Sequence, residues 1–377
     1  MKKLLILLNN LEGGGMQRIT LRLIQSLETQ KNLQITLVLA QATGEYLATL
    51  PPHLHRVDLG IPCHFRLKMI RQMILPLRQS IQSAQADVIL STLPALNFVT
   101  VLAWKLAGSP GKLVLGEHTL PLTRLLEVER KNTSKSLITH LSPLFGRWLY
   151  PQADQVIAVS HGIAQELQSS FKLSSNKVQI IYNPVVDDRL AQQATLPIEH
   201  PWFQAGEPPV FLAVGRLSQQ KDYPTLLQAF AKLCQTHDAR LLILGEGELR
   251  KKLENLIKNL EIESNVDMPG FVTNPYKYIA RATALVLSSV WEVLPTVLIE
   301  ALACGCAVVS TDCDYGPREI LNKGEYGTLV PVGDANALAE AMKQTITQPL
   351  DRQRLQSYAQ KFSVDKAIDR YKEVLAL

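Results

Sequence analysis

Short apolar runs recur along the whole chain, and segments with the pattern of amphipathic helices separate them. A strand that is apolar throughout must be buried on both faces, as in a parallel sheet covered by helices. Ten runs are expected to be strands, at residues 4–8, 35–40, 88–90, 113–116, 156–159, 210–214, 240–244, 285–287, 307–309 and 328–330. We therefore predict an α/β protein with doubly wound parallel sheets.

The spacing of these runs divides the 377 residues into two halves, which suits a chain that is long for a single core. The alternation stops at Pro184 and resumes at Val210, and the polar stretch between them holds four prolines. We predict an inter-domain linker there, between an N-terminal domain at 1–190 and a C-terminal domain at 208–360. The amphipathic segment 363–377 is predicted to be a helix.

The composition is that of a globular protein, with 46% hydrophobic and 19% charged residues. No apolar run approaches the roughly 20 residues of a membrane-spanning helix. The apolar run after Met1 ends at Asn9, so we interpret it as a first strand and not as a signal peptide. The five cysteines fit neither a disulfide framework nor a zinc site. We expect reduced thiols and a cytoplasmic location.

The net charge of +5 is unevenly distributed. Residues 1–190 carry 20 Lys and Arg against 12 Asp and Glu, whereas residues 191–377 carry 19 against 22. A basic first half suggests an anionic partner: a membrane surface, a lipid diphosphate or nucleic acid. Residues 64–78 fit either a helix at a membrane surface or a helix packed on the first sheet. Nucleic acid is disfavoured, because no aromatic residues interleave with the basic ones.

Two glutamates eight positions apart mark the most informative segment. Glu292 follows the apolar run 285–287 and is expected in the loop at the end of a strand. Pro295 can open a helix, because a proline at the first helical position loses no needed N–H. That helix would carry Glu300, and the free N–H groups at its start bind anions. The segment therefore predicts a site for a sugar joined to a diphosphate.

Three further loops follow expected strands. The glycines at 13–15 permit close backbone approach to a ligand, although a flexible turn is the alternative and the G-x-G-x-x-G dinucleotide pattern is absent. Arg216 and Lys221 share a loop, and two cations so placed can clamp the phosphates of a nucleoside diphosphate. His118 follows the run 113–116, where a single histidine is more often structural than functional.

Taken in chain order, these motifs resemble those of the retaining glycosyltransferases of family 4, which have the GT-B fold. The resemblance rests on the glycine loop, on G-R-L-x-x-x-K-D at residues 215–222 and on E-x7-E at residues 292–300, and it covers most of the chain. It implies two Rossmann-like domains that face a cleft, with 363–377 as a terminal helix that crosses back to the N-terminal domain.

The resemblance also assigns roles to residues. Arg216 and Lys221 would stabilise the leaving diphosphate, Glu292 would orient sugar hydroxyls, and His118 would face the transferred sugar. The expected donor-binding residues are Gly14, Gly15, Phe271, Val272, Val293, Leu294, Thr296, Val297 and Glu300.

One departure from the family pattern lies after the first glutamate. Many relatives have Gly and Phe there, where this chain has Val293 and Leu294. In the family the backbone amides of these positions reach the sugar, so we expect the change to reshape the sugar pocket and to set donor choice. The loop at 313–321 resembles one found in a bacterial subset of the family.

The expected function is retaining transfer of a hexose from a nucleotide-diphosphate sugar to a glycan or lipid-linked acceptor, in polysaccharide or glycolipid biosynthesis at the inner face of the membrane. The resemblance implies front-face attack assisted by the leaving phosphate. No cofactor or metal is expected, since the helix start and two cations neutralise the diphosphate. The alternatives are a nucleotide-sugar epimerase of the same architecture and a non-catalytic nucleotide-sugar-binding partner.

Overall fold

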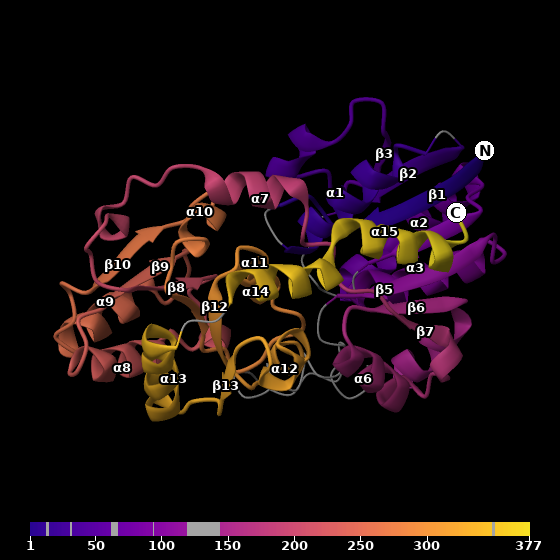
Figure 1. The fold of residues 1–377 in the computed structure, drawn as a ribbon. Coiled ribbons are helices and arrows are strands. Elements are labelled where there is room, and N and C mark those ends of the chain that lie inside the picture. Colours follow the sequence, from indigo (N-terminus) through magenta and orange to yellow (C-terminus); the bar gives the residue numbers. More distant parts are fainter. Residues whose placement is uncertain (13–14, 31, 62–66, 93, 119–143, 349–350) are drawn as a thin grey trace. The chain divides into compact units, whose positions relative to one another are not determined.

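Each half of the chain folds around one parallel sheet with helices on both of its faces (Figure 1). The computed structural model describes residues 1–12, 15–30, 32–61, 67–92, 94–118, 144–348 and 351–377. The chain divides into a first unit, residues 1–184 with 364–377, and a second unit, residues 185–363. The predicted α/β class with two doubly wound parallel sheets is confirmed.

The sheet of the first unit has the strand order β3-β2-β1-β4-β5-β6-β7. Its strands are β1 (Lys2–Leu8), β2 (Leu33–Leu39), β3 (His55–Asp58), β4 (Val88–Ser91), β5 (Lys112–Glu117), β6 (Gln155–Ala158) and β7 (Val178–Ile180). All neighbouring pairs are parallel. The strand order reverses between β1 and β4, the kind of position at which doubly wound folds bind ligands.

Of the helices in the described ranges, α1 (Gly15–Leu27) and α15 (Val364–Leu375) lie on one face of this sheet, and α2 (Leu67–Ala84), α3 (Pro94–Leu106) and α6 (His161–Phe171) lie on the other. Ile24 of α1 and Tyr371 of α15 join the side chains of β1 in one buried cluster. On α2, Met73, Leu77 and Ile81 are four residues apart and buried, so this helix turns one apolar stripe inward. Residues 64–78 were expected to form a helix at a membrane surface or a helix packed on the first sheet. The buried side chains of α2 support the second interpretation.

The sheet of the second unit has the strand order β10-β9-β8-β11-β12-β13. Its strands are β8 (Val210–Val214), β9 (Arg240–Leu244), β10 (Val266–Gly270), β11 (Ala284–Leu287), β12 (Ala307–Thr311) and β13 (Thr328–Val330). All neighbouring pairs are again parallel. The order reverses between β8 and β11.

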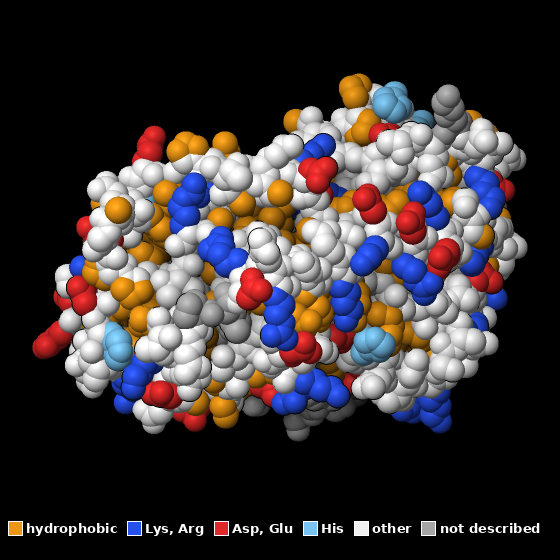
Figure 2. Space-filling model, viewed as in Figure 1, with side chains coloured by type: hydrophobic (Ala, Val, Ile, Leu, Met, Phe, Trp, Pro, Cys, Tyr) orange, Lys and Arg blue, Asp and Glu red, His pale blue; other side chains and the backbone are white. Residues whose placement is uncertain are grey.

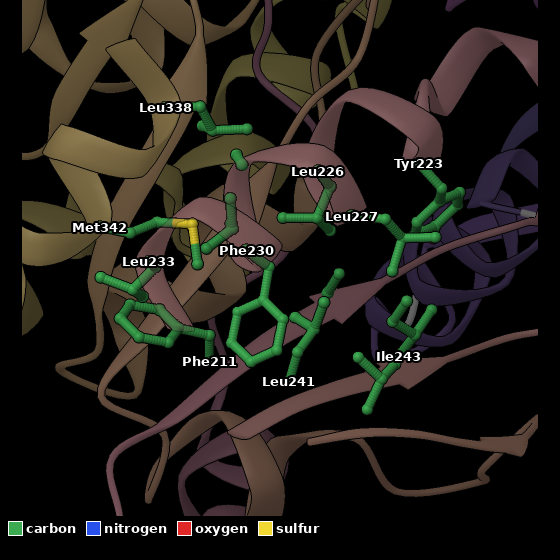
Figure 3. Close-up of a cluster of buried hydrophobic side chains, with 14 of the residues drawn as sticks. Phe211, Tyr223, Leu226, Leu227, Phe230, Leu233, Leu241, Ile243, Leu338 and Met342 are labelled. Atoms are coloured by element: carbon green, nitrogen blue, oxygen red, sulfur yellow. The ribbon is translucent and has the colours of Figure 1, made fainter. Parts of the chain in front are cut away.

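The helices of the second unit form two layers. One layer consists of α8 (Tyr223–Cys234), α9 (Arg250–Asn259) and α13 (Ala335–Thr347), and the other of α10 (Tyr276–Ile279), α11 (Thr296–Ala303) and α14 (Arg352–Ala359). In the first layer Phe230 of α8 and Met342 of α13 pack against Phe211 and Leu241 of the sheet (Figure 3). This apolar layer holds the strands in register and so fixes the loops at their ends.

Three strands are absent from the apolar pattern of the sequence, namely β3, β7 and β10. All three lie at the edge of a sheet, where a strand has one neighbour and is less completely buried. Three of the four residues of β3 are exposed, and β10 contains Pro269, which an edge strand tolerates. Burial on both faces therefore predicts all the inner strands of the two sheets, but of the four edge strands it predicts only β13.

The stretch between Pro184 and Val210, predicted as an inter-domain linker, contains the helix α7 (Asp188–Thr195). Asp187 caps α7 by accepting a hydrogen bond from Leu190 N at 2.9 Å. Arg281 donates to Ala194 O at 3.1 Å, which ties α7 to the rest of the second unit. Polar composition suggested a linker, but local capping and these contacts order the segment.

Candidate active site

The candidate site of the second unit lies at the carboxyl ends of β8 and β11, the neighbouring strands between which the order reverses. One loop, residues 215–222, follows β8, and the other, residues 288–295, follows β11. Gly245, after β9, permits close packing here: its φ is +148°, and a Cβ would stand 2.0 Å from Gly215 O. A glycine is required at this position, since any side chain would push the strand-end loops apart.

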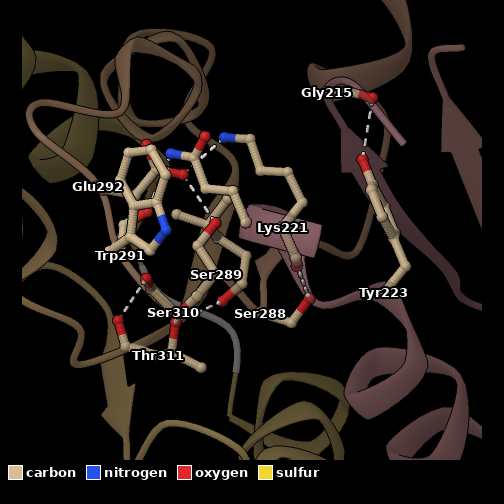
Figure 4. A network of polar contacts seen from close by, with 11 residues as sticks. Gly215, Lys221, Tyr223, Ser288, Ser289, Trp291, Glu292, Ser310 and Thr311 are labelled. Atoms are coloured by element: carbon tan, nitrogen blue, oxygen red, sulfur yellow. Dashed lines mark hydrogen bonds and ion pairs between the residues drawn. The ribbon is translucent and has the colours of Figure 1, made fainter. Parts of the chain in front are cut away.

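Hydrogen bonds join these two loops directly (Figure 4). Val290 N donates to Gln220 O at 2.9 Å, and Gln220 Nε2 donates back to Trp291 O at 3.0 Å. Ser288 Oγ donates to Lys221 O at 2.7 Å. These bonds join residues that are 67 to 71 positions apart in the sequence, and they hold the two loops together.

An ion pair between Lys221 and Glu292 forms the centre of the site, with 2.6 Å between Nζ and Oε1. Its side chains are only 17% and 8% exposed. Ser289 Oγ donates to the same Oε1 at 2.7 Å, whereas no described residue donates to Oε2. Glu292 is therefore anchored through one oxygen and retains the other as an acceptor for a ligand.

The loop after β12 packs against the Glu292 loop. Trp291 and Asp314 form an isolated parallel bridge, and Glu292 N donates to Asp314 O at 3.4 Å. Gly316 has φ +65°, and a Cβ there would stand 2.4 Å from Pro295 Cδ. The segment that the sequence singled out at 313–321 thus forms a wall beside the two strand-end loops.

Arg216, the second predicted cation, and the start of α11 lie in or beside the same strand-end loops. Arg216 is exposed, and its guanidinium bonds to no described residue. The N–H groups of Thr296 and Val297, in the first turn of α11, have no partner within the helix. Glu300 lies one turn beyond Thr296 and is 7% exposed. Lys221 is paired with Glu292, whereas Arg216 and the N–H groups at the start of α11 can bind an anion.

The remaining predicted donor residues differ in exposure. Leu294 is buried and Val293 is half-buried, so of this pair only Val293 has a side chain available to a ligand. Phe271, directly after β10, is 76% exposed, and Val272 is half-buried. An aromatic ring so exposed, at the carboxyl end of a strand of this sheet, is free to pack on a ligand.

The predicted residues of the first unit follow β1 and β5. Gly14 lies outside the described residues, and Gly15 opens α1. His118 follows β5, with Nδ1 3.2 Å from Asn183 Oδ1 and Nε2 3.5 Å from the Tyr371 hydroxyl. Burial lowers the pKa of His118 to about 4, so the ring is neutral at neutral pH.

Sequence reasoning missed Glu117, the residue before His118. Its side chain is fully buried on the opposite face of β5, where the Tyr150 hydroxyl donates to Oε2 at 2.5 Å. Asn97 Nδ2 lies 3.5 Å from the same oxygen, and no described residue bonds to Oε1. Burial raises the pKa of Glu117 to about 8. The signal in the sequence was a charged residue directly after the apolar run 113–116.

Carboxylates and histidines do not form a cluster of three or more that could hold a metal ion anywhere in the described ranges. Asp312 and Asp314 have the spacing of a D-x-D element. Asp312 is instead paired with Arg318, whose Nε donates to Oδ1 at 3.0 Å.

Replacing Glu117 with Gln should change how stability depends on pH. Between its ordinary pKa of 4.5 and about 8, folded Glu117 keeps a proton that the unfolded chain has lost, so the free energy of unfolding falls as pH rises. His118 produces the opposite trend, but only below its ordinary pKa of 6.5. Between pH 6.5 and pH 8, Glu117 should therefore lower the free energy of unfolding by about 2 kcal/mol.

Urea denaturation of the wild-type protein and of Glu117→Gln at pH 6.5 and pH 8 measures this loss. The variant, which is neutral and of the same shape, should lack it. Glu340→Gln, at an exposed position of α13, is the control and should behave like the wild type. An equal pH dependence in all three proteins would show that Glu117 is ionised when folded.

Two family models together match most of the chain. The family model described as Glycosyltransferase Family 4 matches residues 13–189, and the model described as Glycosyl transferases group 1 matches residues 198–362. One relative is the N-acetylgalactosamine-N,N'-diacetylbacillosaminyl-diphospho-undecaprenol 4-alpha-N-acetylgalactosaminyltransferase of Campylobacter jejuni subsp. jejuni serotype O:2. It is 31% identical over 376 residues, which cover 99% of this chain and 97% of the relative.

Two solved structures share the fold of the whole chain. The lipopolysaccharide outer core galactosyltransferase WaaB, in its apo form, has a TM-score of 0.77 at 20% identity and covers 100% of this chain and 99% of its own. Anabaena Alr3699/HepE in complex with UDP-glucose has a TM-score of 0.79 at 20% identity and covers 100% of both chains. The chain is therefore a glycosyltransferase that belongs to family 4 and has the GT-B fold.

Proposed function

We propose that this glycosyltransferase moves a hexose or N-acetylhexosamine, with retention of anomeric configuration, from a nucleotide-diphosphate sugar to a lipid-linked glycan. The observation that carries the proposal is the Lys221–Glu292 pair, held by two strand-end loops beside the exposed Arg216 and the start of α11. This combination offers positive charge for a diphosphate and a carboxylate oxygen for a sugar hydroxyl at one place.

Positive charge at the leaving group is the main catalytic contribution that we propose. As the bond from the anomeric carbon to the diphosphate breaks, negative charge accumulates on the diphosphate oxygens. Arg216 and the N–H groups of Thr296 and Val297 would stabilise that charge. Lys221 has three donor hydrogens, so it can keep its bond to Glu292 while a second hydrogen reaches a phosphate oxygen.

Recognition of the sugar is assigned to Glu292 and His118. Glu292 Oε1 is already occupied by Lys221 and Ser289, so a sugar hydroxyl would donate to Oε2. This anchoring also makes Glu292 a poor nucleophile, which favours a front-face reaction. In that reaction the acceptor oxygen bonds to the anomeric carbon on the side of the departing diphosphate and passes its proton to a diphosphate oxygen.

The relatives support this choice of substrates. The Campylobacter relative is named for the transfer of N-acetylgalactosamine in an alpha linkage to a diphospho-undecaprenol saccharide. An alpha product from a donor whose sugar is alpha-linked to its diphosphate requires net retention. Anabaena Alr3699/HepE was solved with UDP-glucose. A UDP-sugar and a polyprenyl-diphosphate saccharide are therefore the first donor and acceptor to test.

A lipid-linked acceptor suggests contact with a membrane surface, which we propose for the first unit. No described helix combines the length and the hydropathy that crossing a bilayer demands. The helical residues 144–149 nevertheless expose three large apolar side chains, Leu144, Phe145 and Trp148. On the face seen in Figure 2, Lys and Arg of the first unit stand among Asp and Glu around α15, so that face is not uniformly basic. The exposed apolar helix is the better candidate for contact.

Replacing Glu300 with Ala should lower kcat/KM for transfer by at least about 100-fold, because a carboxylate on the nucleoside ribose would lose two charge-assisted hydrogen bonds of roughly 1.5–3 kcal/mol each. Mass spectrometry of the saccharide product and NMR of its anomeric proton measure rate and configuration together. Glu300→Gln, with an unchanged melting temperature, separates lost binding from lost folding.

The matched control is Glu340→Ala, on the exposed face of α13, which should retain the wild-type rate. Undiminished turnover in Glu300→Ala would remove Glu300 from the donor site. Formation of an isomerised sugar without any acceptor would replace the proposal by an epimerase.

Chelation tests the proposal that no metal is required. With Arg216, Lys221 and the start of α11 neutralising the diphosphate, the transfer rate after treatment with excess EDTA should stay within about twofold of the untreated rate. The control is the same protein with Mg²⁺ or Mn²⁺ added back. A larger loss that either ion restores would show that a divalent cation carries part of the charge.

A further inference from the structure

The ring of His118 is held at both of its nitrogen atoms. Nδ1 lies 3.2 Å from Asn183 Oδ1, and Nε2 lies 3.5 Å from the Tyr371 hydroxyl. These partners are themselves fixed, since Asn183 is 5% and Tyr371 is 2% exposed. The ring orientation is therefore set by buried side chains from two distant parts of the chain.

The chemistry of the partners determines where the imidazole carries its proton. An amide oxygen only accepts hydrogen bonds, so Nδ1 must be the protonated nitrogen that donates to Asn183. Burial raises the pKa of Tyr371 above its ordinary value, so its hydroxyl keeps the proton that it donates to Nε2. Because the ring is neutral at neutral pH, Nε2 has a lone pair and no hydrogen.

We propose that Asn183 and Tyr371 are positioning residues that fix His118 in the neutral Nδ1–H form, so that Nε2 accepts a hydrogen bond from a hydroxyl of the transferred sugar. This inference rests on the proposed function, in which His118 faces that sugar. It specifies the chemistry of the contact: His118 recognises a hydrogen-bond donor, and it does not donate to a phosphate oxygen. At 3.5 Å the bond from the Tyr371 hydroxyl is long, so Nε2 can accept a second hydrogen bond from a sugar hydroxyl while Tyr371 still holds the ring.

The backbone beside the ring supports a single orientation. Gly116 lies two residues earlier, on the same face of β5 as His118. A Cβ at Gly116 would stand 3.1 Å from His118 Nε2, so the ring uses the space that the glycine leaves. Asn97 Nδ2 donates to Gly116 O at 3.1 Å and holds this part of the strand.

The two positioning residues lie close to the places where the chain passes between units. Asn183 immediately precedes Pro184, the last residue of the first unit before the chain enters the second. Tyr371 lies on α15, which starts at Val364, where the chain returns to the first unit. The protonation form of the His118 ring thus depends on residues near both connecting segments. Through Tyr371 the terminal helix has a role beyond packing.

The first measurement concerns the free protein and does not depend on activity. Two-dimensional ¹H–¹⁵N NMR of the full chain with ¹⁵N-labelled histidine, with the signals of His118 assigned by their loss in His118→Gln, reports which nitrogen is protonated. We expect the Nδ1–H form at pH 7 in the wild type and in Tyr371→Phe. An Nε2–H form, or a doubly protonated ring, in the wild type would overturn the proposal.

The second measurement uses Asn183→Asp, which preserves shape and supplies a carboxylate. The negative charge should raise the pKa of His118, so that both nitrogens become protonated and Nε2 becomes a donor. Transfer should then fall as pH is lowered through the raised pKa and recover at higher pH, whereas the wild type should show no such step. A residue that only stabilises the fold would leave the shape of the pH profile unchanged, and that result would also overturn the proposal.

Tyr371→Phe tests the terminal helix and should reduce kcat/KM by about 3- to 10-fold, the value of one neutral hydrogen bond. Tyr358→Phe is the matched control, since the Tyr358 hydroxyl bonds to no described residue. Equal rates in wild type and Tyr371→Phe would remove Tyr371 from the proposal. If the NMR result holds but no transfer occurs with any donor, the proposed function fails and the assignment of the ring stands.

Discussion

The ion pair between Lys221 and Glu292 is the interaction on which the site depends. Removing two charges from water is costly, and such a pair contributes little to stability unless further hydrogen bonds compensate. Here the compensation comes from Ser289 at 2.7 Å and from the bonds that join the two strand-end loops. A secluded pair held in this way is better explained by a need for fixed charges than by a need for stability.

The two units differ in electrostatic character at the positions singled out by sequence. In the second unit Lys221 and Arg216 are cationic, which suits a diphosphate. In the first unit His118 is uncharged at pH 7, because burial lowers its pKa to about 4. Neutral donors and acceptors suit the hydroxyl groups of a sugar. The proposed division of labour, charge for the diphosphate and hydrogen bonds for the sugar, follows from these environments.

Sequence predicted those parts of the fold that follow from burial on both faces of a strand. The inner strands were predictable for this reason, whereas the edge strand β3 and the capped helix α7 were not. At the site, the two strand-end loops could be located from Arg216 and Glu292. Their mutual hydrogen bonds through Gln220 depend on contacts between distant residues, which no local pattern encodes.

The burial of Glu117 and the partners of His118 were likewise beyond local patterns. A glutamate at the end of a strand is usually exposed, and only the packing of Asn97 and Tyr150 around it reveals a neutral carboxyl. Tyr371 lies 253 positions from His118 in sequence, so its contact depends on where the terminal helix packs. Residue types indicated where the chemistry lies, while tertiary contacts determined the protonation states.

Calorimetric titration of UDP tests most directly whether this site binds a diphosphate. We expect Arg216→Ala to raise the Kd for UDP by roughly 10- to 100-fold, the value of a charge-assisted hydrogen bond. Lys258→Ala, which removes an exposed cation elsewhere in the second unit, should leave the Kd unchanged. Equal affinity of the wild type and Arg216→Ala, or an equal loss in Lys258→Ala, would contradict the assignment of the diphosphate to this end of the sheet.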